Sequence, residues 1–369
     1  MGDMATPQVR SFPPVPSPLL GLPGAVAARG ADEGVAWHYG DPTAEQRAAE
    51  SGAALIDHTN RDVLAVTGED RLTWLHTLSS QHLTDLADGA STEALFLSPN
   101  GHVEHHAVLT HQDAVVYLDT EPGAGAALLA FLDGMRFWSK VEVAPADLAV
   151  LTLAGPTSAD VAGRARNAEP GRSGPDGGFT RRSAEGLDLV LPRAAVGAVA
   201  QELRAAGAVP AGSWAADALR IPTRRPRWGV DTDEKTIPNE VSWLSTAVHL
   251  HKGCYRGQET VARVHNLGRP PRRLVMLNLD GSVGTLPEPG EPVTSGAGRA
   301  VGRLGTIAQH HELGPIALAL IKRSVEAGTP LLVGGIDAVV DIDDRLDEAE
   351  QQTPLSAIDR RAFTQLRRS

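Results

Sequence analysis

The turn at 99–101, Pro-Asn-Gly, restricts the fold more than any other feature, because it joins two apolar runs. Asn-Gly between such runs is the strongest short-range signal of a β-hairpin, and it predicts antiparallel strands over 93–97 and 102–110. A third strand is expected over 114–119, and the apolar spacing of 125–138 predicts a helix. Hairpin strands interleaved with helices indicate an α+β fold, not a doubly wound parallel sheet.

Similar patterns flank this hairpin on both sides. Thr43 and Gln46 match a capping box, which predicts a helix that ends near Gly52. An alternating strand follows over 62–67, and a strand–helix–strand–strand–helix order recurs over 148–206. The first 270 residues are therefore expected to contain two α+β units.

The pattern changes after the two prolines at 270–271. Short alternating strands separated by Gly and Pro follow, and they predict a small β-barrel. The expected barrel strands are 274–279, 299–308, 316–321, 330–333 and 338–342. We divide the chain into a Pro/Gly/Ala-rich arm (1–35), an α+β region of two subdomains that split near 146–215 (36–270), the barrel (271–345) and a charged tail (346–369).

The composition limits the possible functions. A net charge of -11 over 369 residues argues against non-specific binding to a polyanion, so no direct nucleic-acid binding is expected. The single cysteine excludes a disulfide framework and a zinc or iron–sulfur site built from this chain alone. No segment reaches the roughly 18 apolar residues of a transmembrane helix, and prolines interrupt the N-terminal segment that resembles a signal peptide. We expect a cytoplasmic protein that does not bind membranes.

The single cysteine, Cys254, lies in the most polar and glycine-rich part of the second half of the chain. Lys252 and Arg256 flank it, and Gly257 precedes an expected helix start. Cations and a helix N-terminus lower the pKa of a thiol, so a reactive thiolate is one interpretation. A small buried side chain, the usual state of a free cysteine, is the other interpretation.

A histidine-rich strand follows the hairpin turn. His102, Glu104 and His106 share one face of this strand, and His105 points to the other face. At about 3.4 Å per residue, His102 and His106 lie roughly 13 Å apart, too far to bind one ion together. Glu104 and His106 could supply two ligands of a metal whose other ligands come from elsewhere. We interpret this face as the lining of a cleft and assign no metal site.

Arginine-rich segments at 220–227 and 269–273 stand out in an acidic chain. Arg220 and its neighbours are either solvated surface groups or a rim that binds the carboxylates of a small ligand. Trp228 either belongs to the core or packs on a planar ring of that ligand. Both interpretations stay open at this point.

Residues 252–263, with the sequence KGCYRGQETVAR, closely resemble a known signature. The signature is K-G-C-Y-x-G-Q-E-x-x-A-R of the YgfZ-type folate-binding proteins, which are relatives of the aminomethyltransferase (T-protein) of the glycine cleavage system. Segments 66–70, 99–103 and 219–240 also resemble the pattern of that family. The resemblance covers about residues 50–345.

This resemblance implies a ring of two interleaved α+β subdomains around a folate cavity, closed by the C-terminal barrel. It also implies tetrahydrofolate or a derivative as the ligand, and a role in assembling or repairing iron–sulfur proteins, including enzymes that modify tRNA. Iron–sulfur assembly or client proteins are therefore the expected partners. Cys254 is the implied reactive group, and Lys252 is expected to stabilise its thiolate. The candidate folate-binding residues are Arg220, Trp228, Tyr255, Gln258, Glu259, Arg263 and Glu185.

The chain departs from the aminomethyltransferases at one position of the resemblance. Those enzymes carry a catalytic aspartate in the strand after the glycine turn, whereas residues 101–106 of this chain contain none. Without that carboxylate, one-carbon transfer lacks its expected acid/base group. Whether the protein is an enzyme therefore stays open. One alternative is a one-carbon transferase in which Glu104 or His105 replaces the aspartate. The other is a folate-binding adaptor without chemistry, in which Cys254 is structural.

Overall fold

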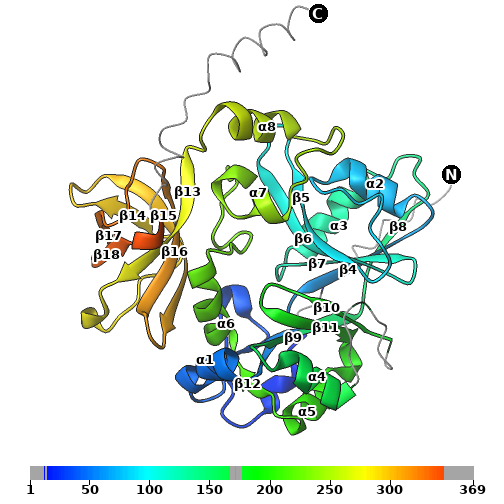
Figure 1. Cartoon of the computed structure of the whole chain (residues 1–369), viewed down its shortest axis with the longest axis horizontal. Coiled ribbons are helices and arrows are strands. Elements are labelled where there is room, and N and C mark those ends of the chain that lie inside the picture. Colours follow the sequence, from blue (N-terminus) through cyan, green and yellow to red (C-terminus); the bar gives the residue numbers. More distant parts are fainter. Residues whose placement is uncertain (1–11, 13–14, 167–170, 172–176, 345–369) are drawn as a thin grey trace, which may run out of the picture.

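The chain forms two five-stranded sheets and a closed six-stranded barrel, arranged around a common centre (Figure 1). The structure is a computed structural model, and it describes residues 12, 15–166, 171 and 177–344. In Figure 1 the barrel lies on the left, and the two sheets lie on the right, one above the other. This arrangement confirms the expected α+β fold with a C-terminal barrel. None of the helices in the described ranges has the length and apolar character needed to span a bilayer.

The first sheet contains the hairpin expected from the sequence. Its strand order is β5-β6-β7-β4-β8, and Leu95 pairs with His106 across the hairpin. Helix α3 ends at Gly134, four residues before the expected end, and Phe137 beyond it has a positive φ of 42°, which a helix cannot contain. The elements are β4 (Asp62–Thr67), α2 (Arg71–Leu78), β5 (Ser91–Leu97), β6 (Val103–Gln112), β7 (Val115–Thr120), α3 (Gly125–Gly134) and β8 (Glu142–Pro145).

The second sheet has the order β10-β11-β9-β3-β12. Strand β3 precedes the whole first sheet in sequence but joins the second one, so the two subdomains are interleaved. The sequence patterns did not indicate β3, because four of its five residues are buried and no alternation marks it. The elements are α1 (Pro42–Ser51), β3 (Ala54–His58), β9 (Leu148–Ala154), α4 (Ser158–Arg166), β10 (Phe179–Arg182), β11 (Gly186–Pro192), α5 (Val196–Ala205), β12 (Val209–Ala211) and α6 (Ser213–Arg220).

Helix α1 begins at Pro42, before the expected N-cap Thr43, and a different residue caps it. Asp41 is the N-cap, and its Oδ1 accepts hydrogen bonds from the backbone N–H groups of Thr43 and Ala44 at 3.1 and 3.0 Å. Gln46, expected in the capping box, instead bonds to the barrel at Gln309. The capping-box prediction was therefore wrong, although the helix it marked is real.

The C-terminal barrel closes in the order β13-β16-β15-β14-β17-β18. Five of its strands match the expected segments, and the sixth, β14, was missed because it has only four residues in a Gly/Pro-rich stretch. The strands are β13 (Arg272–Leu279), β14 (Pro292–Ser295), β15 (Ala300–His310), β16 (Gly314–Lys322), β17 (Pro330–Val333) and β18 (Ile336–Val340). Between the second sheet and the barrel, the chain forms α7 (Trp243–Thr246) and α8 (Gln258–Leu267).

Part of the expected N-terminal arm is ordered against the body. Leu19 is buried in the core of the second sheet, and β1 (Val26–Ala27) pairs with β2 (Ala36–His38). The composition of the arm left its order open, and these contacts attach residues 19–38 to the second sheet and to each other. Residues 1–11 and 13–14, most of the glycine-rich loop at 171–178 and the tail from 345 onward lie outside the described residues.

Candidate functional site

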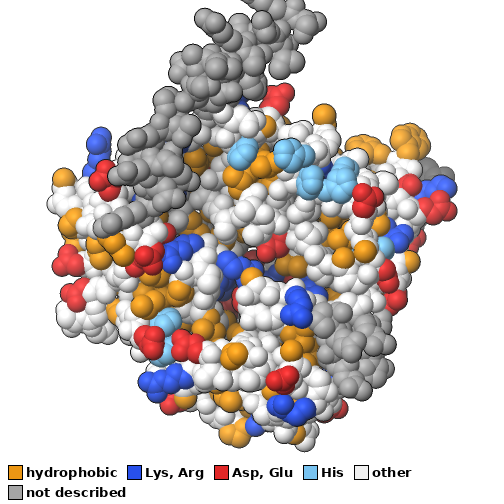
Figure 2. All heavy atoms as spheres, viewed as in Figure 1, with side chains coloured by type: hydrophobic (Ala, Val, Ile, Leu, Met, Phe, Trp, Pro, Cys, Tyr) orange, Lys and Arg blue, Asp and Glu red, His pale blue; other side chains and the backbone are white. Residues whose placement is uncertain are grey.

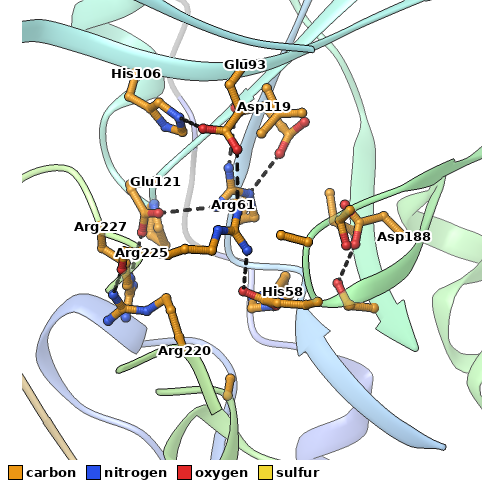
Figure 3. Close-up of a pocket in the computed structure, with 18 of the residues that line it drawn as sticks. His58, Arg61, Glu93, His106, Asp119, Glu121, Asp188, Arg220, Arg225 and Arg227 are labelled. Atoms are coloured by element: carbon orange, nitrogen blue, oxygen red, sulfur yellow. Dashed lines mark hydrogen bonds and ion pairs between the residues drawn. The ribbon is translucent and has the colours of Figure 1, made fainter. Parts of the chain in front are cut away.

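A cavity of about 310 Å³ lies where the two sheets face each other. Strands β5, β6 and β7 of the first sheet line it, together with β3, β9 and the β10–β11 turn of the second sheet. Helix α6 and residues 225–227 complete the lining. In Figure 2, Lys and Arg side chains gather near the centre of the visible face, where the surface is hollowed. Figure 3 shows the labelled side chains of both sheets pointing into the same space.

Buried ion pairs form one wall of this cavity. Arg61 bonds to Asp119 at 2.9 Å and to Glu121 at 3.3 Å, and Arg181 bonds to Asp119 and Asp188, each at 3.0 Å. Burial by itself would raise the pKa of Asp119, but the guanidinium groups of Arg181 and Arg61 lower it to about 2. Asp119 is therefore charged near neutral pH, and it positions both arginines.

Arg220 lies on the opposite side and is also fully engaged. Its guanidinium donates to Asp217 at 2.9 Å, Asp231 at 2.8 Å and the Thr306 hydroxyl at 2.6 Å. The side chain is 6% exposed, and Asp231 and Thr306 connect it to the barrel side of the ring. Arg220 lines the cavity as the sequence suggested, but its hydrogen bonds hold α6 to the barrel.

The centre of the cavity contains two histidine–glutamate pairs with an arginine between them. Glu93 of β5 contacts His106 of β6 at 3.3 Å, and Glu185 of the β10–β11 turn contacts His58 of β3 at 3.4 Å. Arg225 lies 3.5 Å from each glutamate. Burial would raise the pKa of each glutamate, but the paired histidine and Arg225 lower both values to about 2. Burial lowers the pKa of His58, but Glu185 more than compensates, and the net shift is upward.

The imidazole of His106 is held in a fixed orientation. It stacks on Trp243 with a centroid distance of 4.7 Å and an interplanar angle of 15°. The Glu93 oxygen that contacts it also accepts a hydrogen bond from the Thr246 hydroxyl at 3.0 Å. A carboxylate–imidazole pair of this kind is suited to proton transfer, because the carboxylate fixes both the tautomer and the ring direction.

The signature segment runs into the first turns of α8, and its Gly257 packs against the hairpin turn of the first sheet. Gly257 has a φ of +82°, and a side chain there would meet Ser98 O at 2.5 Å and Gly101 Cα at 2.8 Å. Lys252 is buried, and its ammonium donates to three backbone carbonyls, those of His76, Ser79 at 2.6 Å and Gln81 at 2.9 Å. Burial lowers its pKa to about 8.

Cys254 is exposed on the same segment. Within the described residues, its Sγ has no hydrogen bond or ion pair. The exposure of Cys254 argues against the interpretation as a small buried side chain. The ammonium of Lys252 points toward the three backbone carbonyls to which it donates. The thiolate role of Cys254 stays a prediction.

The other predicted site residues are divided between the cavity and the outer body. Glu185 and Arg220 line the cavity. Among the described residues that line it, none is Trp228, Tyr255, Gln258, Glu259 or Arg263. Tyr255 is buried in the core between the first sheet and the barrel, where burial raises its pKa to about 12, and Trp228 packs against the same core. Arg263 is exposed on α8.

The alternative aspartate replacements are also outside the cavity, since Glu104 pairs with Arg256 and His105 packs on Phe131.

Sequence reasoning missed most of the cavity. The strand alternation predicted that His102, Glu104 and His106 face a cleft, and of these only His106 is among the residues lining the cavity. The basic run 220–227 contained Arg225, but neither pattern identified a partner. His58, Arg61 and Glu93 carried no signal, because their roles depend on contacts between two sheets distant in sequence.

Two family models match this chain. Residues 24–170 match the GCVT N-terminal domain, and residues 272–361 match the CAF17 C-terminal beta-barrel domain. Among similar proteins, "Putative transferase At1g60990, chloroplastic" of Arabidopsis thaliana is 24% identical over 88% of this chain and 78% of its own length. An aminomethyltransferase of Rubrobacter xylanophilus is 28% identical over 80% of this chain and 83% of its own length.

A solved structure shares the architecture. The glycine cleavage system aminomethyltransferase T from Bartonella henselae superposes with a TM-score of 0.75, covering 86% of this chain and 93% of its own. The two sequences are 21% identical, so this similarity establishes the fold alone.

Proposed function

Because this chain joins a GCVT N-terminal domain to a CAF17 C-terminal barrel on an aminomethyltransferase-like fold, we propose that it is a tetrahydrofolate-binding protein of the YgfZ type. We propose further that it supports the assembly or repair of iron–sulfur proteins, and so the enzymes among them that modify tRNA. Its partners would be assembly or client proteins. The cytoplasmic location stays a prediction, because the Arabidopsis relative is chloroplastic by name.

The observation that supports a ligand most directly is that two residues lining the central cavity each carry an unsatisfied polar atom. Asp57 Oδ2 and Ser183 Oγ belong to residues that line the cavity, and both are buried without a hydrogen-bond partner in the described structure. Such atoms are costly unless a ligand or water satisfies them. The cavity volume is at the lower end of the roughly 300–1,000 Å³ typical of small-molecule sites. A polar heterocycle such as a pterin carries N–H groups that would donate to the Asp57 carboxylate once its side chain turns toward the cavity.

Calorimetry with 5-formyltetrahydrofolate, a stable reduced folate, tests the ligand. We expect saturable binding, and Asp57→Asn should weaken it by about tenfold, as the loss of one charge-assisted hydrogen bond predicts. Absence of both binding heat and a thermal shift in the wild-type protein would remove the folate proposal.

The exposed Cys254 supports the iron–sulfur part of the proposal. Its thiol would contact a cluster transiently or share it with a partner, since one thiolate cannot hold a cluster. In cells that lack the native protein, we expect Cys254→Ser to reduce the activity of cluster-dependent enzymes, with Gly253→Ala as the control. Full activity with the serine variant would instead indicate an adaptor without thiol chemistry.

A one-carbon transferase is the second candidate, and the His106–Glu93 pair is the observation that favours it. Here His106, and not Glu104 or His105, would replace the aspartate of the aminomethyltransferases. Formation of methylenetetrahydrofolate from an aminomethyl-loaded carrier protein would support this candidate, and His106→Gln should abolish that activity. A wild-type protein that forms no product would exclude it.

A further inference from the structure

The backbone around Arg225 is anchored at several points. Arg224 bonds to Asp344 and Asp341, each at 3.1 Å, at the end of the barrel. The carbonyl of Arg225 accepts a hydrogen bond from the Arg220 guanidinium. Pro226 follows, and it restricts the backbone of the residue before it. The Arg225 side chain therefore extends into the cavity from a fixed position.

In contrast to its backbone, the Arg225 side chain is loosely held. Its contacts to Glu93 and Glu185 are 3.5 Å long, and the side chain is 30% exposed. Arg61 and Arg181, on the cavity wall, instead make hydrogen bonds of 2.9 to 3.0 Å to carboxylates and are 16% and 4% exposed. Long, solvated ion pairs contribute little free energy, so an incoming anion can replace them at low cost.

Both glutamates keep a partner when Arg225 moves. Glu93 retains His106 and the Thr246 hydroxyl, and Glu185 retains His58. Displacement of Arg225 therefore leaves neither carboxylate without a partner. Leaving a partly buried carboxylate unpaired would be costly. The two histidine–glutamate pairs therefore remain intact when Arg225 moves to bind a ligand.

We propose that Arg225 is the residue of this cavity that binds the carboxylate of the ligand. On binding, the guanidinium turns from Glu93 and Glu185 to form a bidentate contact with a ligand carboxylate. This inference rests on the proposed function, in which that carboxylate belongs to the glutamyl part of the folate. It replaces the sequence expectation that Arg220 or Arg263 has this role, because the guanidinium of Arg220 is already engaged and Arg263 lies on the outer surface.

The test compares ligands with and without the carboxylate in wild-type protein and Arg225→Gln. We expect the variant to bind 5-formyltetrahydrofolate at least about tenfold more weakly, the cost of one good charge-assisted contact. Binding of 6-methyltetrahydropterin, which has no carboxylate, should not change. Arg225→Lys should recover part of the lost affinity. Arg204→Gln, at an exposed arginine of α5 that is not among the residues lining the cavity, is the control and should bind as wild type does.

Two results would overturn the assignment of Arg225. One is wild-type folate affinity in Arg225→Gln, and the other is an equal loss of pterin affinity, which would indicate a disrupted cavity. If the wild-type protein binds no folate, the proposed function fails. The carboxylate site at Arg225 is then tested separately, by measuring the binding of millimolar glutarate with saturation-transfer NMR. Glutarate binding that is lost in Arg225→Gln would support the carboxylate site. Absence of glutarate binding, or its retention in the variant, would overturn it.

Discussion

Lys252 and Cys254 are two residues apart in the chain but lie in opposite environments. The ammonium of Lys252 is buried among three backbone carbonyl oxygens, one in the last turn of α2 and two in the segment after it. Cys254, in contrast, is exposed. Three acceptors stabilise the charged form of an amine, so the lysine remains protonated at neutral pH despite its lowered pKa. At the scale of single residues, the signature therefore combines an internal anchor with an accessible thiol.

Substitution of Lys252 should affect folding more than substitution of Cys254. Lys252→Met leaves three buried carbonyls without their donor, and we expect a loss of about 3 kcal/mol in the free energy of unfolding. Cys254→Ser should change it by less than about 0.5 kcal/mol, as exposed substitutions usually do. Urea unfolding of both variants checks this. Equal stability of Lys252→Met and wild type would contradict the anchoring role.

Gly257 and Gly253 provide a matched pair within the signature. Gly257→Ala combines a positive φ with a contact against Ser98 O and should destabilise the protein by about 1–3 kcal/mol. No atom lies within 4 Å of the Cβ position of Gly253, so Gly253→Ala should be close to neutral. Thermal unfolding distinguishes them, and a neutral Gly257→Ala would mean that the signature does not dock on the hairpin turn.

At the scale of elements, two helices of the α+β region attach the barrel. In α1, Gln46 exchanges hydrogen bonds with Gln309 O and the backbone N–H of His311, at 2.9 and 2.8 Å. From α6, Arg220 reaches Thr306, and Asp231 accepts a hydrogen bond from the Thr306 backbone at 2.7 Å. Both contacts lie on β15 or the turn after it, so this strand receives the polar connections that these two helices make.

Removal of Asp231 tests the connection through α6. Asp231→Ala leaves Arg220 without one buried carboxylate and the Thr306 N–H without its acceptor, and we expect a loss of about 3–5 kcal/mol. Asp337→Ala, on an exposed position of β18, is the control. Differential scanning calorimetry measures both. An Asp231→Ala protein that unfolds like the control would contradict the role of Asp231 in holding the barrel to α6.

At the scale of the whole molecule, the paired charges of the cavity join the two sheets. Arg181 of β10 reaches Asp119 of β7, and Arg225 stands between glutamates of both sheets. The buried contacts between Arg181 and Asp119 hold the two sheets together here, because a buried charge without a partner is costly. They also make the stability of the protein dependent on pH.

Acid should destabilise the protein over a defined range. Burial by itself would raise the pKa values of four carboxyl groups in the cavity, but their arginine and histidine partners lower these values to about 2. The four groups are Glu93, Asp119, Glu121 and Glu185. In the unfolded chain these pKa values are about 4. The unfolded state therefore binds more protons between about pH 5 and pH 2, and the free energy of unfolding falls as the pH drops through this range. Urea unfolding at pH 7, 5, 4 and 3 checks this, and Arg181→Met should flatten the dependence. A free energy that stays constant from pH 5 to pH 3 would contradict it.

The sequence by itself determined the features that depend on neighbouring residues. The Asn-Gly turn predicted its hairpin, strand alternation predicted most of the barrel and the cleft-facing side of His106, and the 252–263 signature identified the family resemblance. Each of these follows from local backbone preferences or from a contiguous motif.

Only the tertiary structure decided which residues meet in the cavity and which do not. It joined β3 to the second sheet, brought His58 to Glu185 across more than a hundred residues, and placed Arg225 between the two sheets. It also showed that the Lys252 ammonium bonds to backbone carbonyls, and that Arg220 lines the cavity while its guanidinium bonds to the barrel. The reason is physical: local patterns specify the face of a strand, whereas the partner of a buried charge is specified by the packing of elements distant in sequence.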